Sequence, residues 1–352
     1  MIKVFIVDDS ALIRALLTEI LNKPEDIEVV GTAPDPLAAR DKIKETNPDV
    51  LTLDIEMPHM DGISFLKNLM RLRPMPVVMI STLTEKGAPA TLEALALGAV
   101  DFVGKPKTDL NNSMHSFGEE IVEKVRAASV ANVRVLENTP RPSTAPVNKA
   151  VTGRNLYVKS GYLVAIGAST GGTEAIKTVL IDLPENSPPI VLAQHIPANF
   201  SASYAQRLDD NCAIKVYEAE HQQPILPGCA YLAPGDFHLR ISKSHDGYTC
   251  LLDQKEKESR HRPSVDALFN SIAELGKGHA MAALLTGMGS DGAQGLLAMK
   301  KANCVTLVQD EASSVVWGMP GSAVKINAHS EIVSLHKMAS KIIANSMFSK
   351  KG

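Results

Sequence analysis

The sequence predicts a two-domain α/β protein in which each domain is built on a parallel sheet. The chain has 352 residues, and at about 100–200 residues per domain this length accommodates two domains. Apolar strand-like runs alternate with helix-like runs in two series, before about residue 107 and after about residue 160. A stretch rich in Pro, Ser, Thr and Asn separates the two series. We therefore expect domains at 1–128 and 159–350, joined by a linker at 129–158.

Five strand-like runs fill the first half, and helix-like runs separate them. In order, strand and helix runs read KVFIVDD and SALIRALLTEIL, IEVVGTA and DPLAARDKIKET, DVLTLDI and DGISFLKNLMRL, PVVMIST and PATLEALALGA, then DFVGKP. Strands joined by crossover helices run parallel, so helices should cover both faces of this sheet. A last helix is expected over about 117–136, leading into the linker.

The second half repeats the alternation with an interruption. The runs that predict buried strands are YLVAIGA, PIVLAQHI, MAALLTG and CVTLVQ. Between the second and third of these, the short pieces GCAYLAP, HLRIS and YTCLLD predict an inserted hairpin region over about 212–260. The second domain is therefore also α/β.

Composition excludes several classes of protein. Hydrophobic residues make up 45% of the chain and charged residues 21%, as in globular proteins and unlike disordered or fibrous ones. A net charge of -3 gives no electrostatic reason to expect a nucleic-acid or membrane partner. No apolar run approaches the roughly 18 residues of a membrane span, and MIKVFIVDDS does not resemble a secretory signal, so we expect a cytoplasmic protein. The four cysteines show no C-x-x-C spacing and are expected to be reduced.

Polar residues stand where the strands of the first domain end. Asp8 and Asp9 follow the first strand, and Asp54 ends the third. Ser81 ends the fourth and Lys105 the fifth, and the carboxyl ends of parallel strands share one edge of the sheet. Clustered carboxylates need a cation, and Mg²⁺ prefers such oxygens, while a carboxylate can also attack phosphorus to give an aspartyl phosphate. The alternative is that these aspartates only cap helices, but their convergence favours a phosphoacceptor site with magnesium.

This half of the chain resembles the response-regulator receiver domain. The resemblance lies in VDDS, LDIEMPHMDG, MIST and GAVDFVGKP and covers residues 1 to about 125. It implies a flavodoxin-like fold with Asp54 as the residue phosphorylated by a histidine kinase, and Mg²⁺ held by Asp8, Asp9 and Asp54. The residues that it assigns to the phosphorylation switch are Ser81, Phe102 and Lys105.

The stretch LVAIGASTGG, residues 163–172, allows a dinucleotide cradle, a serine nucleophile or a plain turn. Its spacing is G-x-x-x-G-G rather than the dinucleotide pattern G-x-G-x-x-G. A cradle also needs an acidic residue about 20 positions later to hold a ribose, but the residues there are Gln194 and His195. An imidazole at the end of the next strand instead favours the nucleophile interpretation.

Ser169, His195 and Asp291 form the candidate catalytic set. Ser169 follows one predicted strand and His195 closes the next, so both side chains face one edge if the strands are parallel neighbours. A serine needs a histidine to take its proton, and the histidine needs an acid to orient it. Asp291 is preferred over Asp310 and Glu311, because the glycines around Asp291 let the backbone pass close to the site.

Each member of this set also has a structural interpretation. Ser169 or Thr170 can cap the following helix, and Asp291 can cap the helix that begins near Ala293. His195 alone can be a buried, hydrogen-bonded histidine. Six other histidines, among them His261, receive no catalytic role because none ends a core strand. The serine also lacks the G-x-S-x-G elbow of α/β-hydrolases.

Residues from about 160 to 345 resemble the catalytic domain of the CheB family of chemotaxis methylesterases and glutamine deamidases. The motifs are IGASTGG, QHIP, APGD, RHRPSVD, LTGMGSDGAQG and WGMP. The resemblance implies a Rossmann-like hydrolase domain with Ser169 as nucleophile, His195 as general base and Asp291 as the acid that orients it. Two residues in matching motifs, Thr170 and Met288, are candidates for the oxyanion site. Arg262 either pairs with acidic groups of the substrate or braces the fold.

The resemblance implies a phosphorylation-activated serine hydrolase. By this resemblance, its substrates would be glutamate methyl esters on the cytoplasmic helices of chemoreceptors, and it would also deamidate glutamines there, without a cofactor for hydrolysis. The unmodified receiver would cover the catalytic face, and phosphorylation would release it. Two other classes stay open: a docking module without catalysis, and an oxidoreductase that binds a nicotinamide. A transcription factor is disfavoured, because no helix-turn-helix pattern or basic stripe follows the linker.

Overall fold

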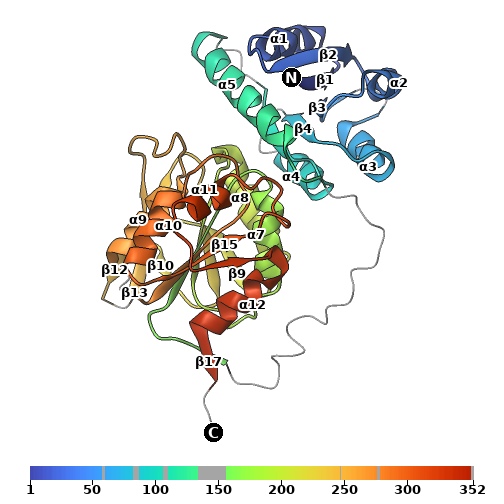
Figure 1. Cartoon of the computed structure of the whole chain (residues 1–352). Coiled ribbons are helices and arrows are strands. Elements are labelled where there is room, and N and C mark those ends of the chain that lie inside the picture. Colours follow the sequence, from blue (N-terminus) through green and yellow to red (C-terminus); the bar gives the residue numbers. More distant parts are fainter. Residues whose placement is uncertain are drawn as a thin grey trace. The chain divides into compact units, whose positions relative to one another are not determined.

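The computed structural model describes residues 1–57, 60–81, 87–105, 110–133, 156–245, 247–275 and 278–349. The chain divides into two compact units, Met1–Asn138 and Thr139–Gly352 (Figure 1). Each unit has a mostly parallel sheet with helices on both sides, so the predicted α/β class is confirmed for both halves. The positions of the predicted domain boundaries stay a prediction.

The first unit contains a five-stranded parallel sheet in the order β2-β1-β3-β4-β5. Strands and helices alternate as β1 Ile2–Val7, α1 Ala11–Leu21, β2 Ile27–Ala33, α2 Pro36–Thr46, β3 Val50–Asp54, α3 Gly62–Leu72, β4 Val77–Ser81, α4 Ala88–Ala96, β5 Asp101–Gly104 and α5 Leu110–Ser129. Strands β3 and β4 are buried along their whole length, as expected for central strands covered on both faces. The last helix was expected at about 117–136, but α5 begins earlier and ends at Ser129, where the chain passes into a turn.

Polar caps begin three of these helices. Ser10 accepts a hydrogen bond from the amide of Ile13, and Asp35 caps α2 in the same way. Asp61 caps α3. Asp8 and Asp9 are therefore not the caps of α1, and their carboxylates stay at the sheet edge for another role.

The second unit contains a seven-stranded parallel sheet in the order β16-β15-β14-β7-β8-β11-β9. Its strands are β7 Leu163–Ala168, β8 Ile190–Gln194, β9 Lys215–Glu218, β11 Cys229–Leu232, β14 Ala280–Leu284, β15 Val305–Gln309 and β16 Glu331–Val333. Its helices are α7 Gly172–Ile181, α8 Ala198–Asp209, α9 Val265–Leu275, α10 Ala293–Lys301, α11 Met319–Lys325 and α12 Leu335–Ser346. Figure 1 shows α9 and α10 on one side of this sheet, with α7, α8 and α12 on the other.

The predicted hairpin insertion is smaller than expected. Strands β10 Pro224–Ile225, β12 His238–Ser244 and β13 Gly247–Asp253 form a three-stranded antiparallel sheet. The piece GCAYLAP was expected in this insertion, but it forms β11 and pairs with β8 in the main sheet. Residues 230–232 are buried on both faces, which suits a strand inside a covered sheet rather than a one-sided hairpin.

Two further findings complete the fold. The predicted linker ends in β6 Leu156–Val158, which is a strand that pairs with β17 Met347–Ser349. The composition of this segment did not show that pairing, because its partner lies near the other end of the chain. Among the described residues, no helix is both long and apolar enough to cross a membrane.

Candidate active site and phosphoacceptor site

Adjacent strands bring Ser169 and His195 together. Ser169 directly follows β7 and His195 directly follows β8, and these strands are parallel neighbours with Ala168 opposite Gln194. Nδ1 of His195 lies 3.0 Å from Oγ of Ser169. The sheet therefore places a base within hydrogen-bond distance of the serine hydroxyl.

Asp291 joins them from the loop after β14. Its Oδ2 lies 2.7 Å from Nε2 of His195, and its side chain is only 2% exposed. The carboxylate also accepts bonds from Oγ of Ser264 and from the amides of Val265 and Asp266, at 2.8 to 2.9 Å. Burial opposes the charge, but the His195 bond and these amides hold the pKa of Asp291 at about 2. Asp291 is therefore an ionised carboxylate aimed at His195.

The hydrogen bonds of His195 indicate which ring nitrogen carries the hydrogen and which one accepts. Because an ionised carboxylate only accepts, Nε2 of His195 carries the hydrogen and donates it to Asp291. Nδ1 then has a free lone pair toward Oγ of Ser169. In the chymotrypsin-type arrangement Nε2 faces the serine; here Nδ1 does, with the same chemical roles available.

Neither capping interpretation describes these residues. The N-cap of α7 is Gly171, with φ 74°, and not Ser169 or Thr170. The N-cap of α10 is Gly292, with φ 85°. Both positions need the left-handed backbone that glycine adopts readily. Asp291 does cap a helix, but it is α9, through the amides of Val265 and Asp266.

Buried polar side chains lock the loops around Ser169. Nε2 of Gln194 donates to the carbonyl of Ser169 at 2.9 Å, and the amide of Ser169 donates to the carbonyl of Thr286. Oγ1 of Thr286 donates to the carbonyl of Thr170 at 3.0 Å and accepts from the amide of Val316. The loop of Ser169 is thus tied to two other loops at the same edge, which fixes the serine in place.

Gly287 lets the backbone pass close to the serine. A Cβ at this position would lie 2.2 Å from Sδ of Met319 and 2.9 Å from Cβ of Ser169. The next residue, Met288, is half-buried, and its amide donates no hydrogen bond to any of the residues that the structure describes. Thr170, the residue after the serine, is buried.

Two sequence candidates have other partners. Asp310 accepts a bond from the amide of Ser313 at 3.1 Å and another from its hydroxyl, so it is engaged away from His195. Arg262 donates to Oδ1 of Asp236 through Nε and Nη2, at 3.0 and 2.6 Å. Its Nη1 donates to the carbonyls of Gln254 and Lys255, at 2.8 and 2.7 Å. These bonds favour the bracing interpretation of Arg262.

His261 is a site residue that the sequence reasoning missed. Its ring stacks on that of His195, with centroids 3.7 Å apart and planes 15° from parallel. It lies in RHRPSVD next to Arg262, outside any core strand, so neither periodicity nor position at a strand end could identify it. Only the tertiary path of that turn brings it to the site.

The first unit holds a second cluster, at the carboxyl edge of its own sheet. Carboxylate oxygens of Asp8, Asp9 and Asp54 all lie within 4.8 Å of one another. Nζ of Lys105 lies 2.7 Å from Oδ2 of Asp54 and 3.1 Å from Oδ2 of Asp8. Burial raises the pKa of Asp54 to about 6, although Lys105 opposes this shift. The sheet thus brings together the acidic residues and the lysine that the sequence singled out.

These carboxylates fit a divalent cation. Oδ2 of Asp8 is buried and accepts no hydrogen bond from the described residues, although the Lys105 ammonium is its ion-pair partner. A buried carboxylate oxygen whose partner among the described residues is one ammonium group, beside two other carboxylates, is suited to a hard cation such as Mg²⁺. Asp8, Asp9 and Asp54 would hold the ion, which would offset the charge on a transferred phosphoryl group.

Ser81 and Phe102, two of the residues predicted to form the switch, have buried side chains in β4 and β5. Oγ of Ser81 lies 2.9 Å from Oγ1 of Thr91 in α4, and both are buried. Phe102 is buried in β5, and Nζ of Lys124 lies 5.0 Å from the centre of its ring. A hollow of about 680 Å³ lies beside the cluster, with Asp9 and Ser81 in its lining.

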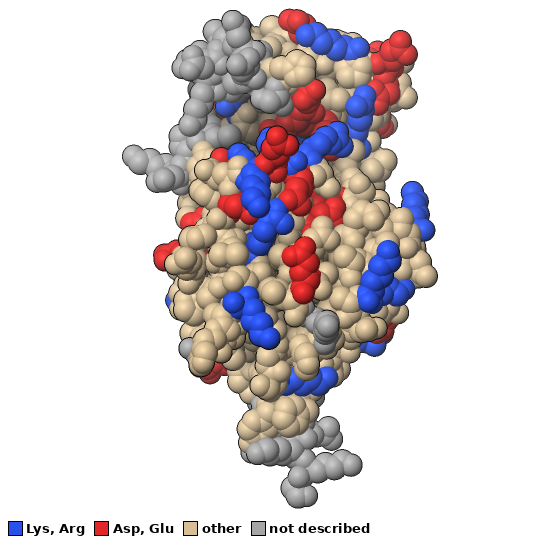
Figure 2. Space-filling model, turned by 90° about the vertical axis from the view of Figure 1, so that its left-hand side faces the viewer, with Lys and Arg blue, Asp and Glu red and all other residues tan. Residues whose placement is uncertain are grey.

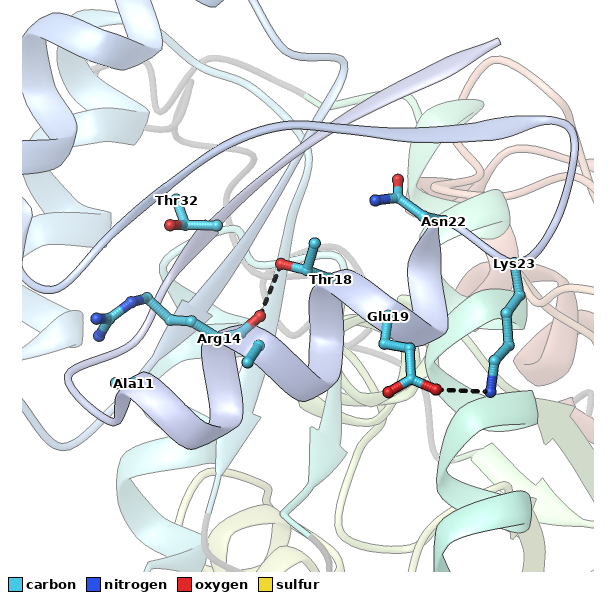
Figure 3. Close-up of a pocket in the computed structure, with 8 residues that line it drawn as sticks. Ala11, Arg14, Thr18, Glu19, Asn22, Lys23 and Thr32 are labelled. Carbon is cyan, nitrogen blue, oxygen red and sulfur yellow. Dashed lines mark hydrogen bonds and ion pairs between the residues drawn. The ribbon is translucent and has the colours of Figure 1, made fainter.

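Arg14 of α1 holds the backbone of Asp8 and Asp9 in place. Its guanidinium donates to the carbonyls of Asp8 and Asp9, at 2.7 and 3.0 Å. Arg14 also lines an open hollow of about 610 Å³ along α1, shown in Figure 3, where Thr18 donates to the Arg14 carbonyl.

The surface charges are mixed on the face shown in Figure 2, where Lys and Arg are interspersed with Asp and Glu.

Comparisons with known proteins agree with both halves of the chain. Residues 164–342 match the family model described as CheB methylesterase, and residues 4–114 match the response regulator receiver domain. A protein of Saccharophagus degradans named protein-glutamate methylesterase/protein-glutamine glutaminase 2 is 56% identical over 98% of this chain and 99% of its own length. A Xanthomonas campestris protein of the corresponding name, numbered 1, is 53% identical over 97% of both chains.

A solved structure resembles the second unit. It is the CheB methylesterase catalytic domain of Thermotoga maritima, with a TM-score of 0.52 and 37% sequence identity. The match covers 53% of this chain and 99% of that one. The chain therefore belongs to the CheB methylesterase family, as an enzyme that joins a response-regulator receiver domain to a methylesterase domain.

Proposed function

We propose that Ser169, His195 and Asp291 are the catalytic triad that hydrolyses glutamate γ-methyl esters on the cytoplasmic helices of chemoreceptors. The observation that carries this proposal is the unbroken chain of contacts from hydroxyl to imidazole to carboxylate, at 3.0 and 2.7 Å. The names of the relatives supply the substrate class, which the geometry alone does not specify.

The reaction follows from the roles of the three side chains. Oγ of Ser169 attacks the ester carbonyl carbon while Nδ1 of His195 takes the hydroxyl proton. The tetrahedral intermediate collapses, the proton passes from His195 to the departing methoxide, and methanol leaves. Water then attacks the Ser169 ester with His195 again as base, which releases the glutamate carboxylate and restores the serine. With a glutamine substrate the leaving group is ammonia, and the product is the same carboxylate.

The oxyanion of the intermediate needs hydrogen-bond donors beside Ser169. The amide of Met288 is a suitable donor, because it lies next to Gly287 at the serine and has no acceptor among the described residues. Thr170, which directly follows the nucleophile in the sequence, is the second candidate. Arg262 serves as a brace for the turn that carries His261.

The receiver supplies the control. A histidine kinase phosphorylates Asp54, with Mg²⁺ held by Asp8, Asp9 and Asp54 and with Lys105 offsetting charge. Ser81 and Phe102 respond to the phosphoryl group, and release of the catalytic face by the receiver then raises activity. We assign the receiver to residues 1–128 and the catalytic domain to 159–350, and place the enzyme in the cytoplasm, where receptor helices and kinase are found.

Methanol release from a methylated chemoreceptor tests the proposal. Wild type should release methanol, and Ser169→Ala should fall to the uncatalysed rate. A small-molecule phosphodonor with Mg²⁺ should raise the wild-type rate but not that of Asp54→Asn. Equal rates for wild type and Ser169→Ala would reject the triad. A wild type that ignores the phosphodonor would reject the regulatory half alone.

A further inference from the structure

His261 makes an unusual contact with the proposed general base. Its imidazole lies parallel to that of His195 with 3.7 Å between ring centres. Within the described parts of the chain, the His261 ring has no hydrogen bond to Ser169, Asp291 or any other side chain. Its contribution therefore comes from contact between the ring faces and not from passing a proton along a chain of bonds.

The turn that carries His261 is held firmly in an uncommon shape. Ser259 and Arg260 have φ values of 50° and 68°, in the left-handed region that non-glycine residues rarely adopt. The amide of His261 donates to the carbonyl of Glu258 at 2.9 Å and closes the turn. The next residue, Arg262, is held in place by the bonds of its side chain to Asp236 and to a backbone carbonyl. A backbone shape of this kind persists when surrounding bonds enforce it, and such shapes gather at functional sites.

The turn is also tied to the catalytic acid. Oγ of Ser259 donates to Oδ2 of Asp266 at 3.0 Å, and the amide of Asp266 donates to Asp291. The turn that places His261 and the carboxylate that orients His195 are thus both anchored at the beginning of α9. This shared anchor fixes the stacked ring relative to the triad.

We infer that His261 is a positioning residue that holds the His195 ring edge-on to Ser169 and Asp291; the inference rests on the proposed hydrolase function. A half-turn of the His195 ring about its Cβ–Cγ bond would present carbon atoms to both partners and break both hydrogen bonds. Such a rotation passes through an orientation perpendicular to its present plane, where the ring would collide with a parallel ring 3.7 Å away. His261 therefore blocks the rotation on that face.

The charge state of His261 suits this task. The charged and titratable groups acting on it are His195, Asp291, Arg260 and Lys257. Burial, and next the proximity of His195, lower the pKa of His261 to about 3, although Asp291 opposes this. A neutral ring at neutral pH lets His195 accept the serine proton without repulsion from a second imidazolium.

The test compares four proteins: wild type, His261→Phe, His261→Ala and the inactive control Ser169→Ala. His261→Phe keeps a flat ring but cannot titrate or donate a hydrogen bond, whereas His261→Ala removes the ring. We expect His261→Ala to lose about tenfold or more in kcat for methanol release with little change in KM, because orientation of the base is lost. His261→Phe should keep kcat within about threefold of wild type.

The split between kcat and KM, together with the rescue of kcat by His261→Phe, separates positioning from folding. Thermal unfolding of each variant checks the fold. Wild-type kcat in folded His261→Ala would overturn the inference, as would equal losses of kcat in folded His261→Ala and His261→Phe. An active Ser169→Ala would instead reject the hydrolase function itself.

Discussion

At the scale of single residues, the candidate active site depends on positions where no other side chain would preserve the contacts. Asp291 occupies a position where every partner is a donor: the His195 ring, the Ser264 hydroxyl and two amides of α9. Gly287 occupies a position where any side chain would meet Ser169 and Met319. We therefore expect substitutions of Asp291 and Gly287 to have large effects on activity or stability, even where they change only one or two atoms.

Asp291→Asn should nearly abolish hydrolysis. The amide nitrogen cannot accept from Nε2 of His195, which favours the tautomer whose Nδ1 carries hydrogen and cannot take the Ser169 proton. A fall in kcat of about 10⁴-fold is expected, measured as methanol release at saturating substrate. Asp310→Asn is the matched control, since Asp310 bonds to Ser313 instead, and should keep most of its activity. A larger loss of kcat in Asp310→Asn than in Asp291→Asn would contradict the assignment of Asp291 as the acid that orients His195.

Gly287→Ala should disturb both stability and catalysis. The added Cβ would lie 2.2 Å from Sδ of Met319 and 2.9 Å from Cβ of Ser169, so one of them must move. We expect a loss of about 1–3 kcal/mol in the free energy of unfolding, and a fall in kcat of roughly 100-fold from displacement of the nucleophile. An unchanged kcat in folded Gly287→Ala would show that Ser169 is not displaced.

At the scale of elements, the beginning of helix α9 organises the catalytic edge. Its first amides are satisfied by a carboxylate from another loop, and its residue Val265 packs against β7 so closely that a Cβ at Gly167 would lie 2.1 Å from Val265 Cγ1. The strand that leads to Ser169 and the helix bonded to Asp291 are therefore in direct contact. Packing between them sets the distance between Ser169 and Asp291.

Gly167→Ala tests this packing. Forcing β7 and α9 apart should lower the free energy of unfolding of the catalytic unit by about 1–3 kcal/mol. It should also lower kcat, because the acid moves with the helix. Gly118→Ala in α5 is the control, since its added Cβ would meet nothing closer than 3.6 Å, and it should leave both quantities near wild type. Chemical denaturation and methanol release measure the two effects, and an unchanged Gly167→Ala would refute the close contact.

At the scale of the whole molecule, two sheets of the same class place different chemistry at their carboxyl edges. In the first unit three carboxylates and a lysine gather there, and in the second a serine, two histidines and an aspartate. Parallel sheets produce this arrangement because every strand ends at one edge.

The buried charge of Asp54 predicts how stability depends on pH. Burial raises its pKa in the folded chain to about 6, so the folded state holds this proton more tightly than the unfolded chain does. Ionisation therefore removes stability as the pH rises from about 4 to about 6, and the loss persists above that range. Asp54→Asn, which never ionises, should be more stable than wild type at pH 7 by about 1–2 kcal/mol and similar to it at pH 4.

Urea unfolding in a metal chelator, followed on the receiver unit, measures this difference. Asp41→Asn is the control, because Asp41 is exposed and pairs with Lys44 at the surface. The free energy of unfolding of Asp41→Asn should match that of wild type at both pH 4 and pH 7. A stability difference between Asp54→Asn and wild type that does not grow with pH would contradict the burial argument.

Strand periodicity and the residues at strand ends were enough to predict much of this protein. The α/β class, the alternation of strands and helices, and the gathering of Asp8, Asp54 and Lys105 all follow from local pattern and from the shared edge of parallel strands. The same reasoning predicted that Ser169 and His195 would be neighbours, because one crossover separates their strands. Local sequence carries this information because each strand pattern repeats within a few residues.

Tertiary structure alone decided the rest. The placement of β11 in the main sheet, the pairing of β6 with β17, the capping of α9 by Asp291 and the stacking of His261 on His195 all join segments far apart in the chain. None of them has a periodic or compositional signature, because each depends on how turns direct the backbone through space. The sequence by itself determined which groups reach the edge of each sheet, and the packing of loops and helices decided which of those groups touch.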